Sequence, residues 1–160
     1  YRKRIYIIGF DKRCFKLNPD FYWPLSHPKK IGIGKFVEQN ISGYSISKHL
    51  QKTYLYKLND GRPQLITPSS DFPVKTLVAS YHKIQRLTGT FVADGETGVR
   101  LLTPNECKAI MGFPSDFKIP VSRTQMYRQM GNSVAVPVIK AVAKEIVATL
   151  INAKILKKVA

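Results

Sequence analysis

A short polar turn near the C-terminus has residues that could hold an anionic ligand. Asn132 and Ser133 offer short polar side chains, and Pro137 suits the first turn of the helix that follows. Helix N-termini bind carboxylate and phosphate groups because their first N–H groups have no partner within the helix. The turn is therefore a candidate ligand site, although a plain loop before a packed helix explains the same residues.

A pair of arginines near the N-terminus could bind a second polar group. Arg2 and Arg4 alternate with Lys3 ahead of an apolar run, residues 5–10, that is typical of a buried strand. Alternate residues of a strand share one face, so the two guanidinium groups would repel each other unless an anion or acceptor lay between them. A solvated basic terminus is the alternative.

Three helices must position these groups. One begins near Ser122 and is predicted to end at Gly131, since glycine adopts the left-handed conformation beyond a helix end at little cost. The next helix starts at Pro137, and its apolar residues recur at helical spacing. This stripe, which we expect to pack, comprises Ile139, Val142, Ala143, Ile146, Val147, Leu150 and Ile151.

An earlier helix carries its own start and stop signals. Thr103 is a suitable N-cap, Pro104 fits the first helical position, and Glu106 completes a capping box. Gly112 ends the helix. The residues expected to face inward are Cys107, Ile110 and Met111.

Together these segments resemble the cytosine-5 DNA methyltransferase family. Residues 100–114 and 125–137 resemble the last two motifs of that family, and residues 1–10 resemble its Gln-x-Arg-x-Arg segment with the strand that follows. One departure is visible. The family usually has arginine three residues after the glutamate, where this chain has Ala109, so any salt bridge of that arginine is absent or comes from another residue such as Lys108.

The resemblance implies roles for both polar groups. Arg4 would donate to a cytosine flipped out of double-stranded DNA, because the reactive carbon is inaccessible in the stack, and Arg2 would support it. The edge of the S-adenosyl-L-methionine pocket would include Asn132, Ser133 and Val134. A cysteine adds to the cytosine ring in such enzymes.

The interval 11–99 corresponds to the target recognition domain of the family. We expect a short helix at 35–40, a strand at 53–58, a turn at 59–63 and a hairpin turn at 91–96. By resemblance, Thr76 contacts a DNA phosphate. The side chains whose donors suit base edges are Arg62, Gln64, Tyr81, His82, Lys83, Gln85 and Arg86, and an ordinary exposed hairpin is the alternative for the later ones.

The composition favours a polyanion as partner. Lysine and arginine total 26 against 10 acidic residues, which gives a net charge of +16. The two cysteines have no metal-ligand spacing, and no apolar run approaches the ~20 residues of a membrane span. We therefore expect no metal and no membrane, and a cytoplasmic, nucleoid-associated location in bacteria.

We expect an α+β fold in which a β-rich recognition domain is followed by helices that pack onto a catalytic Rossmann-like α/β domain mostly absent from the chain. The expected parts are 1–10 (catalytic-domain strand), 11–99 (recognition domain), 100–121 (small-domain helix and loop) and 122–160 (C-terminal helices).

The function expected from this resemblance is the C-terminal part of a DNA (cytosine-5-)-methyltransferase of a restriction-modification system. Neither cysteine follows a proline as the nucleophile would, so we expect the chain alone to be inactive and to need a catalytic N-terminal half or subunit. A non-catalytic, sequence-specific DNA-binding module or specificity subunit is the alternative. An RNA-binding protein is disfavoured, because no aromatic-rich RNA-binding pattern, Gly-x-x-Gly clamp or zinc knuckle is present.

Overall fold

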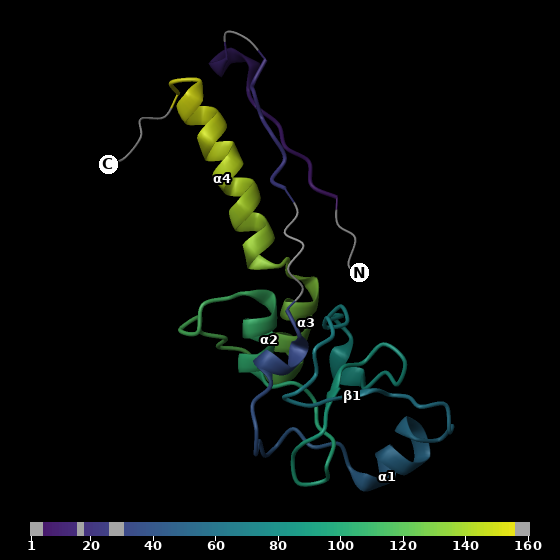
Figure 1. Cartoon of the computed structure of the whole chain (residues 1–160). Coiled ribbons are helices and arrows are strands. Elements are labelled where there is room, and N and C mark those ends of the chain that lie inside the picture. The colour runs from purple at the N-terminus through teal and green to yellow at the C-terminus, as the bar shows by residue number, and fades with distance from the viewer. Residues whose placement is uncertain (1–4, 16–17, 26–30, 156–160) are drawn as a thin grey trace. The chain divides into compact units, whose positions relative to one another are not determined.

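The structure is a computed structural model that describes residues 5–15, 18–25 and 31–155 (Figure 1). The chain forms two compact units. The first takes in residues 29–134 and the second combines residues 2–28 with residues 135–160, as far as these residues are described. The expected cytosine contacts, Arg2 and Arg4, lie outside the described residues.

The first unit consists mainly of loops held by short elements. Two strands, β1 (Leu65–Ile66) and β2 (Phe91–Val92), pair in parallel, with Leu65 opposite Phe91. The fold is therefore α+β, but the described residues of this region are not β-rich as we expected. The helical elements are the 3₁₀ turns Ile33–Phe36 and Tyr81–Lys83, α1 (Lys48–Leu50), the π-helical turn Gln51–Leu55, α2 (Pro104–Met111) and α3 (Arg123–Asn132).

Two predicted elements of this unit were wrong because non-local contacts decide them. The segment predicted as a strand, 53–58, begins instead in the π-helical turn, whose buried Gln51 donates through Nε2 to the Thr97 carbonyl at 3.2 Å. The helix expected at 35–40 is the 3₁₀ turn Ile33–Phe36. Gly34 in this turn packs against backbone, where an added β-carbon would lie 2.7 Å from the carbonyl carbon of Pro68.

The predicted turns are confirmed. Gly61 has φ +68° in the turn at 59–63. In the hairpin, Val92 and Arg100 exchange both backbone hydrogen bonds at 3.0 Å, and Gly95 has φ +81°. Both turns could be predicted because they need glycine at a positive φ, and the glycine is visible in the sequence.

Helix α2 has the predicted ends. The Thr103 hydroxyl accepts from the Glu106 N–H at 3.1 Å, the Glu106 carboxylate accepts from the Thr103 N–H at 2.7 Å, and Gly112 has φ +77°. Helix α3 packs beside α2 (Figure 1). Its Gly131 is not the predicted left-handed stop, since α3 continues through Asn132 and ends at the cap Ser133.

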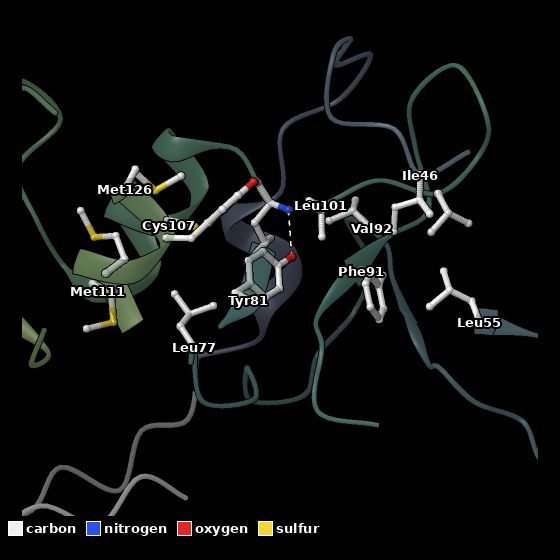
Figure 2. Packing of buried hydrophobic residues seen from close by; sticks show 14 residues of the cluster. Ile46, Leu55, Leu77, Tyr81, Phe91, Val92, Leu101, Cys107, Met111 and Met126 are labelled. Atoms are coloured by element: carbon white, nitrogen blue, oxygen red, sulfur yellow. Dashed lines mark hydrogen bonds between the residues drawn. The ribbon is translucent and has the colours of Figure 1, made fainter. Parts of the chain in front are cut away.

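The core of the first unit lies between the helices α2 and α3 and the loops that precede them in the sequence. Figure 2 shows Met111, Cys107 and Met126 of the two helices on one side, with Phe91 and Leu55 on the other. Tyr81 lies between these groups, with a hydrogen bond at its hydroxyl (Figure 2). The core is therefore assembled from segments far apart in sequence rather than from one sheet.

The second unit contains a single long helix, α4 (Val136–Asn152), within its described residues. Pro137 is in the first turn as predicted. The apolar stripe is only partly covered, because Val142 is buried while Ile139 and Val147 remain 39% and 45% exposed. Thr149 is buried, and its hydroxyl donates to the Glu145 carbonyl at 2.9 Å.

The N-terminal apolar run is not a buried strand in the described structure. Residues 5–10 form no strand, and Ile5 and Ile7 are about nine-tenths exposed. A strand requires a neighbour for its N–H and C=O groups, and no described segment pairs with this one. Across the described parts of the chain, no helix is long and apolar enough to cross a membrane.

Candidate nucleic-acid interface

A buried ion pair fixes the frame of the first unit. Arg100 and Glu106 are both fully buried, and the two ends of the guanidinium group donate to the two carboxylate oxygens at 2.9 Å. Such paired geometry is strong and directional. Burial by itself would lower the pKa of Arg100, but the hydrogen bonds to the Glu106 and Asp94 carboxylates outweigh it and raise the pKa. The guanidinium is therefore a permanent cation in the core.

The same guanidinium connects three loops. It donates to the Asp94 carboxylate at 2.8 Å and to the Glu38 carbonyl at 2.7 Å. Burial by itself would raise the pKa of Asp94, but the hydrogen bonds from Arg100 and from backbone N–H groups outweigh it and lower the pKa to about 2. Glu106 also accepts from the Glu38 N–H at 2.8 Å. The loops near residues 38, 94 and 100 are thus held as one body.

Glu106 takes its salt bridge from Arg100 and not from a residue three positions after it, where this chain has Ala109. Lys108, which we had suggested, instead donates to the carbonyls of Ser115 and Phe117 at 2.7 and 3.3 Å. The sequence signal for the partner of Glu106 was Arg100, which lies six residues before it. We missed it because the pair closes through the fold rather than along one helix face.

Tyr81, which we expected to read bases, belongs to the core. It is 3% exposed, donates through its hydroxyl to the Thr90 carbonyl and accepts from the Leu102 N–H at 3.0 Å (Figure 2). Tyr127 donates to the carbonyl of the same Leu102 at 2.6 Å. The two tyrosines thus bind both backbone groups of one residue. A base edge cannot reach this hydroxyl, so the prediction for Tyr81 was wrong.

Arg86 is likewise turned inward and is a second correction. It is 9% exposed, forms an ion pair with Asp60, and donates through Nε to the Leu55 carbonyl at 2.8 Å. The hydrogen bond from Arg86 lowers the pKa of Asp60. Its guanidinium is thus used to hold a loop. Composition could not show this, because exposed and buried arginines look alike in sequence.

The remaining base-reading candidates differ in exposure. Lys83 and Gln85 are exposed, although the Gln85 side-chain oxygen accepts from the Thr88 hydroxyl at 2.7 Å. His82 is half-buried, and within the described structure its Nδ1 is buried without a hydrogen-bond partner. Arg62 and Gln64 are both exposed. The surface thus keeps five of the seven side chains that we expected to face DNA.

Gly131 packs against the backbone of Val78 and Ala79, close in sequence to Thr76. A β-carbon there would lie only 2.6 Å from the Cα of Ala79, so α3 and the segment 76–79 touch backbone to backbone. Thr76 precedes this contact and is half-buried. Asn132, which is exposed, and Ser133, which is half-buried, follow Gly131 at the end of α3. The need for glycine is therefore close approach and not a left-handed turn.

The edge formed by residues 132–134 suits a polar ligand. Ser133 caps α3 through its N–H, which donates to the Gln129 carbonyl at 2.9 Å, and Val134 is half-buried beside it. These residues could line one side of a pocket for S-adenosyl-L-methionine but could not enclose it. The described residues hold no cluster that could bind a metal ion.

The two cysteines of the chain lie in different settings. Cys107 is fully buried, and burial raises the pKa of its thiol to about 12, so it stays protonated at neutral pH. Cys14 is exposed at the end of a 3₁₀ turn, Lys12–Cys14, in the second unit.

Comparison with known proteins gives a consistent picture. The model of the C-5 cytosine-specific DNA methylase family matches residues 1–148. The type II methyltransferase M.MspI of Moraxella is 60% identical over 147 residues, and M.BsuFI of Bacillus subtilis is 60% identical over 143 residues. These matches cover 91% and 89% of this chain but 34% of each relative, so the chain spans about a third of their length.

Solved structures share the fold. A methyltransferase of Entamoeba histolytica, EhMeth, superposes with a TM-score of 0.59 at 24% identity, covering 85% of this chain and 45% of that one. The Dnmt2 methyltransferase of S. pombe gives a TM-score of 0.57 at 18% identity, over 79% of this chain and 44% of that one.

Proposed function

We propose that this chain, which belongs to the C-5 cytosine-specific DNA methylase family, supplies the DNA-binding and target-recognition part of a DNA (cytosine-5-)-methyltransferase. The whole enzyme would be part of a restriction-modification system. The whole enzyme would transfer a methyl group from S-adenosyl-L-methionine to C5 of a cytosine in double-stranded DNA. The nucleophilic cysteine would come from outside these residues, because Cys107 is buried and Cys14 does not follow a proline.

The observation that carries this proposal is the backbone contact of Gly131 with Ala79. It brings the segment expected to hold a DNA phosphate beside the segment expected to edge the cofactor pocket. A module that only bound DNA would have no need for a cofactor edge such as the one expected at Asn132 and Ser133. The presence of these two residues beside the junction therefore favours a catalytic assembly over a non-catalytic specificity subunit.

In this proposal DNA is held by separate groups with separate tasks. Thr76 would donate to a phosphate beside the target cytosine, and the exposed cations would neutralise other phosphates. Arg4 would donate to the flipped cytosine with Arg2 in support, while Asn132, Ser133 and Val134 would line the cofactor edge. Gln64, His82, Lys83 and Gln85 remain candidates for base contacts, together with Arg62.

The test is the affinity of the chain for duplex DNA at a series of salt concentrations. A net charge of +16 spread over the chain predicts weak binding, mostly through phosphates. The logarithm of the association constant should fall linearly with the logarithm of salt concentration, at a slope near −0.9 per phosphate neutralised. An affinity that barely changes with salt would contradict the proposed DNA-binding role.

A further inference from the structure

A cleft beside the turn at 59–63 brings together residues that are distant in sequence. Its volume is about 650 Å³. The turn forms one wall, and residues 75 and 87 come from the chain on the other side. The lining residues are Asp60, Gly61, Arg62, Gln64, Lys75 and Leu87.

Two donors of the cleft come from one short stretch. Pro63 is buried, whereas its neighbours Arg62 and Gln64 are exposed. Both flanking side chains line the cleft.

Lys75 is a third donor, and no local pattern in the sequence singles it out. It is exposed, and its ammonium group lies 3.4 Å from the Leu87 carbonyl at the far wall of the cleft. An ammonium group has three donors, so this contact uses one and orients the others. The side chain is thus placed at the cleft with donor capacity to spare.

Arg86 fixes the loop that carries Arg62. Besides its bond to Leu55, its guanidinium donates to the carbonyls of Leu58 at 3.4 Å and Arg62 at 3.2 Å. The ion pair with Arg86 balances the charge of Asp60. The cleft therefore presents the positive charges of Arg62 and Lys75 without an uncompensated carboxylate beside them.

We propose that this cleft receives the major-groove edge of a base pair containing guanine, with Arg62 and Lys75 as base-contacting donors and Arg86 as the positioning residue behind them. The proposal rests on the proposed function. Arginine and lysine pair with the O6 and N7 acceptors of guanine, and glutamine pairs with adenine, so Gln64 would favour adenine at an adjacent pair. The cleft would thus form part of the surface that sets sequence preference, and Lys75 would belong to that surface.

The experiment is selection of bound sequences by the full chain from a duplex library with randomised central base pairs. Arg62→Ala and Lys75→Ala should each lower the preference for guanine at one position by about tenfold or more. Arg86→Lys should weaken the preference at the Arg62 position without changing binding to unselected duplexes. Lys52→Ala is the matched control, because Lys52 is exposed but does not line the cleft. It should weaken all duplexes about equally.

Asp60→Asn serves as a second variant, since it loosens the Arg86 clamp from the partly exposed side. If Arg62→Ala and Lys75→Ala, both folded by circular dichroism, keep the wild-type profile, the cleft does not read bases. If both Arg86→Lys and Asp60→Asn keep the wild-type preference at the Arg62 position, Arg86 does not position the base-contacting residues. A wild-type chain that binds all duplexes equally would overturn the proposed function together with this inference. A wild-type preference that survives in every variant overturns this inference alone.

Discussion

Gly131 of α3 touches the backbone of Ala79, and a β-carbon at position 131 would stand 2.6 Å from the Ala79 Cα. Helix and loop therefore meet at a distance that only glycine permits. The contact joins the end of α3, with its exposed Asn132, to the loop that carries Thr76. Displacement of one segment should displace the other.

Gly131→Ala tests this junction. The added methyl group must push α3 and the 76–79 loop apart, and overpacking of this kind costs about 1–3 kcal/mol of unfolding free energy. Because Thr76 moves with the loop, affinity for duplex DNA should fall as well. Chemical denaturation and a DNA titration measure the two effects. The control is Gly9→Ala, since a β-carbon at position 9 would meet nothing within 4 Å. Equal stability and affinity in both variants would contradict the junction.

Tyr81→Phe separates a structural role from base reading. The hydroxyl that is lost binds the Leu102 N–H and the Thr90 carbonyl inside the core. Leaving these groups without a partner should cost about 1–3 kcal/mol of unfolding free energy. The sequence preference in DNA selection should not change. Tyr56→Phe, at an exposed site, should leave stability unchanged. A changed preference in Tyr81→Phe would restore Tyr81 as a base-contacting residue.

Glu106→Gln tests the buried ion pair. The neutral amide cannot compensate the Arg100 charge, and breaking one side of a buried pair typically costs about 3–5 kcal/mol. We expect a marked fall in the thermal midpoint or loss of folding. The matched change Asp116→Asn, on an exposed loop, should have little effect. A Glu106→Gln chain as stable as the wild type would show that the pair does not hold the frame.

The carboxyl of Asp94 predicts a pH dependence of stability. Its pKa is lowered from 3.8 to about 2 in the folded chain, so its contribution is complete above about pH 5 and is lost as the pH falls through the folded pKa of about 2. The size should be about 1–2 kcal/mol, allowing for solvent screening of a carboxylate that is 17% exposed. Asp94→Asn should flatten this part of the curve of unfolding free energy against pH. An unchanged curve would contradict the role of the Arg100 hydrogen bond in lowering the Asp94 pKa.

The contrast between α2 and Tyr81 shows what the sequence could predict. The capping box of Thr103 and Glu106 and the stop at Gly112 depend on neighbours in sequence, and both are confirmed. Tyr81 and Arg86 were misread because their partners, Leu102 and Leu55, lie more than twenty residues away. The sequence could list side chains able to contact DNA. Only the fold shows which of them it uses internally.

Gly131 shows the same limit in backbone form. Position 131 was correctly identified as one that needs glycine, but the predicted reason was a left-handed helix stop. In the structure, the missing side chain instead allows contact with Ala79. Lys75 was not chosen at all, because a lone exposed lysine carries no local signal. Its place beside Arg62 in one cleft is a property of the tertiary structure.

Methyl transfer to DNA tests the central claim most directly. The chain alone, and a hybrid in which it replaces the matching segment of the Moraxella relative M.MspI, would be incubated with unmethylated duplex DNA and methyl-labelled S-adenosyl-L-methionine. We predict label on cytosine C5 with the hybrid and none with the chain alone. A folded hybrid that transfers no label, or a purified chain that transfers label by itself, would contradict the account.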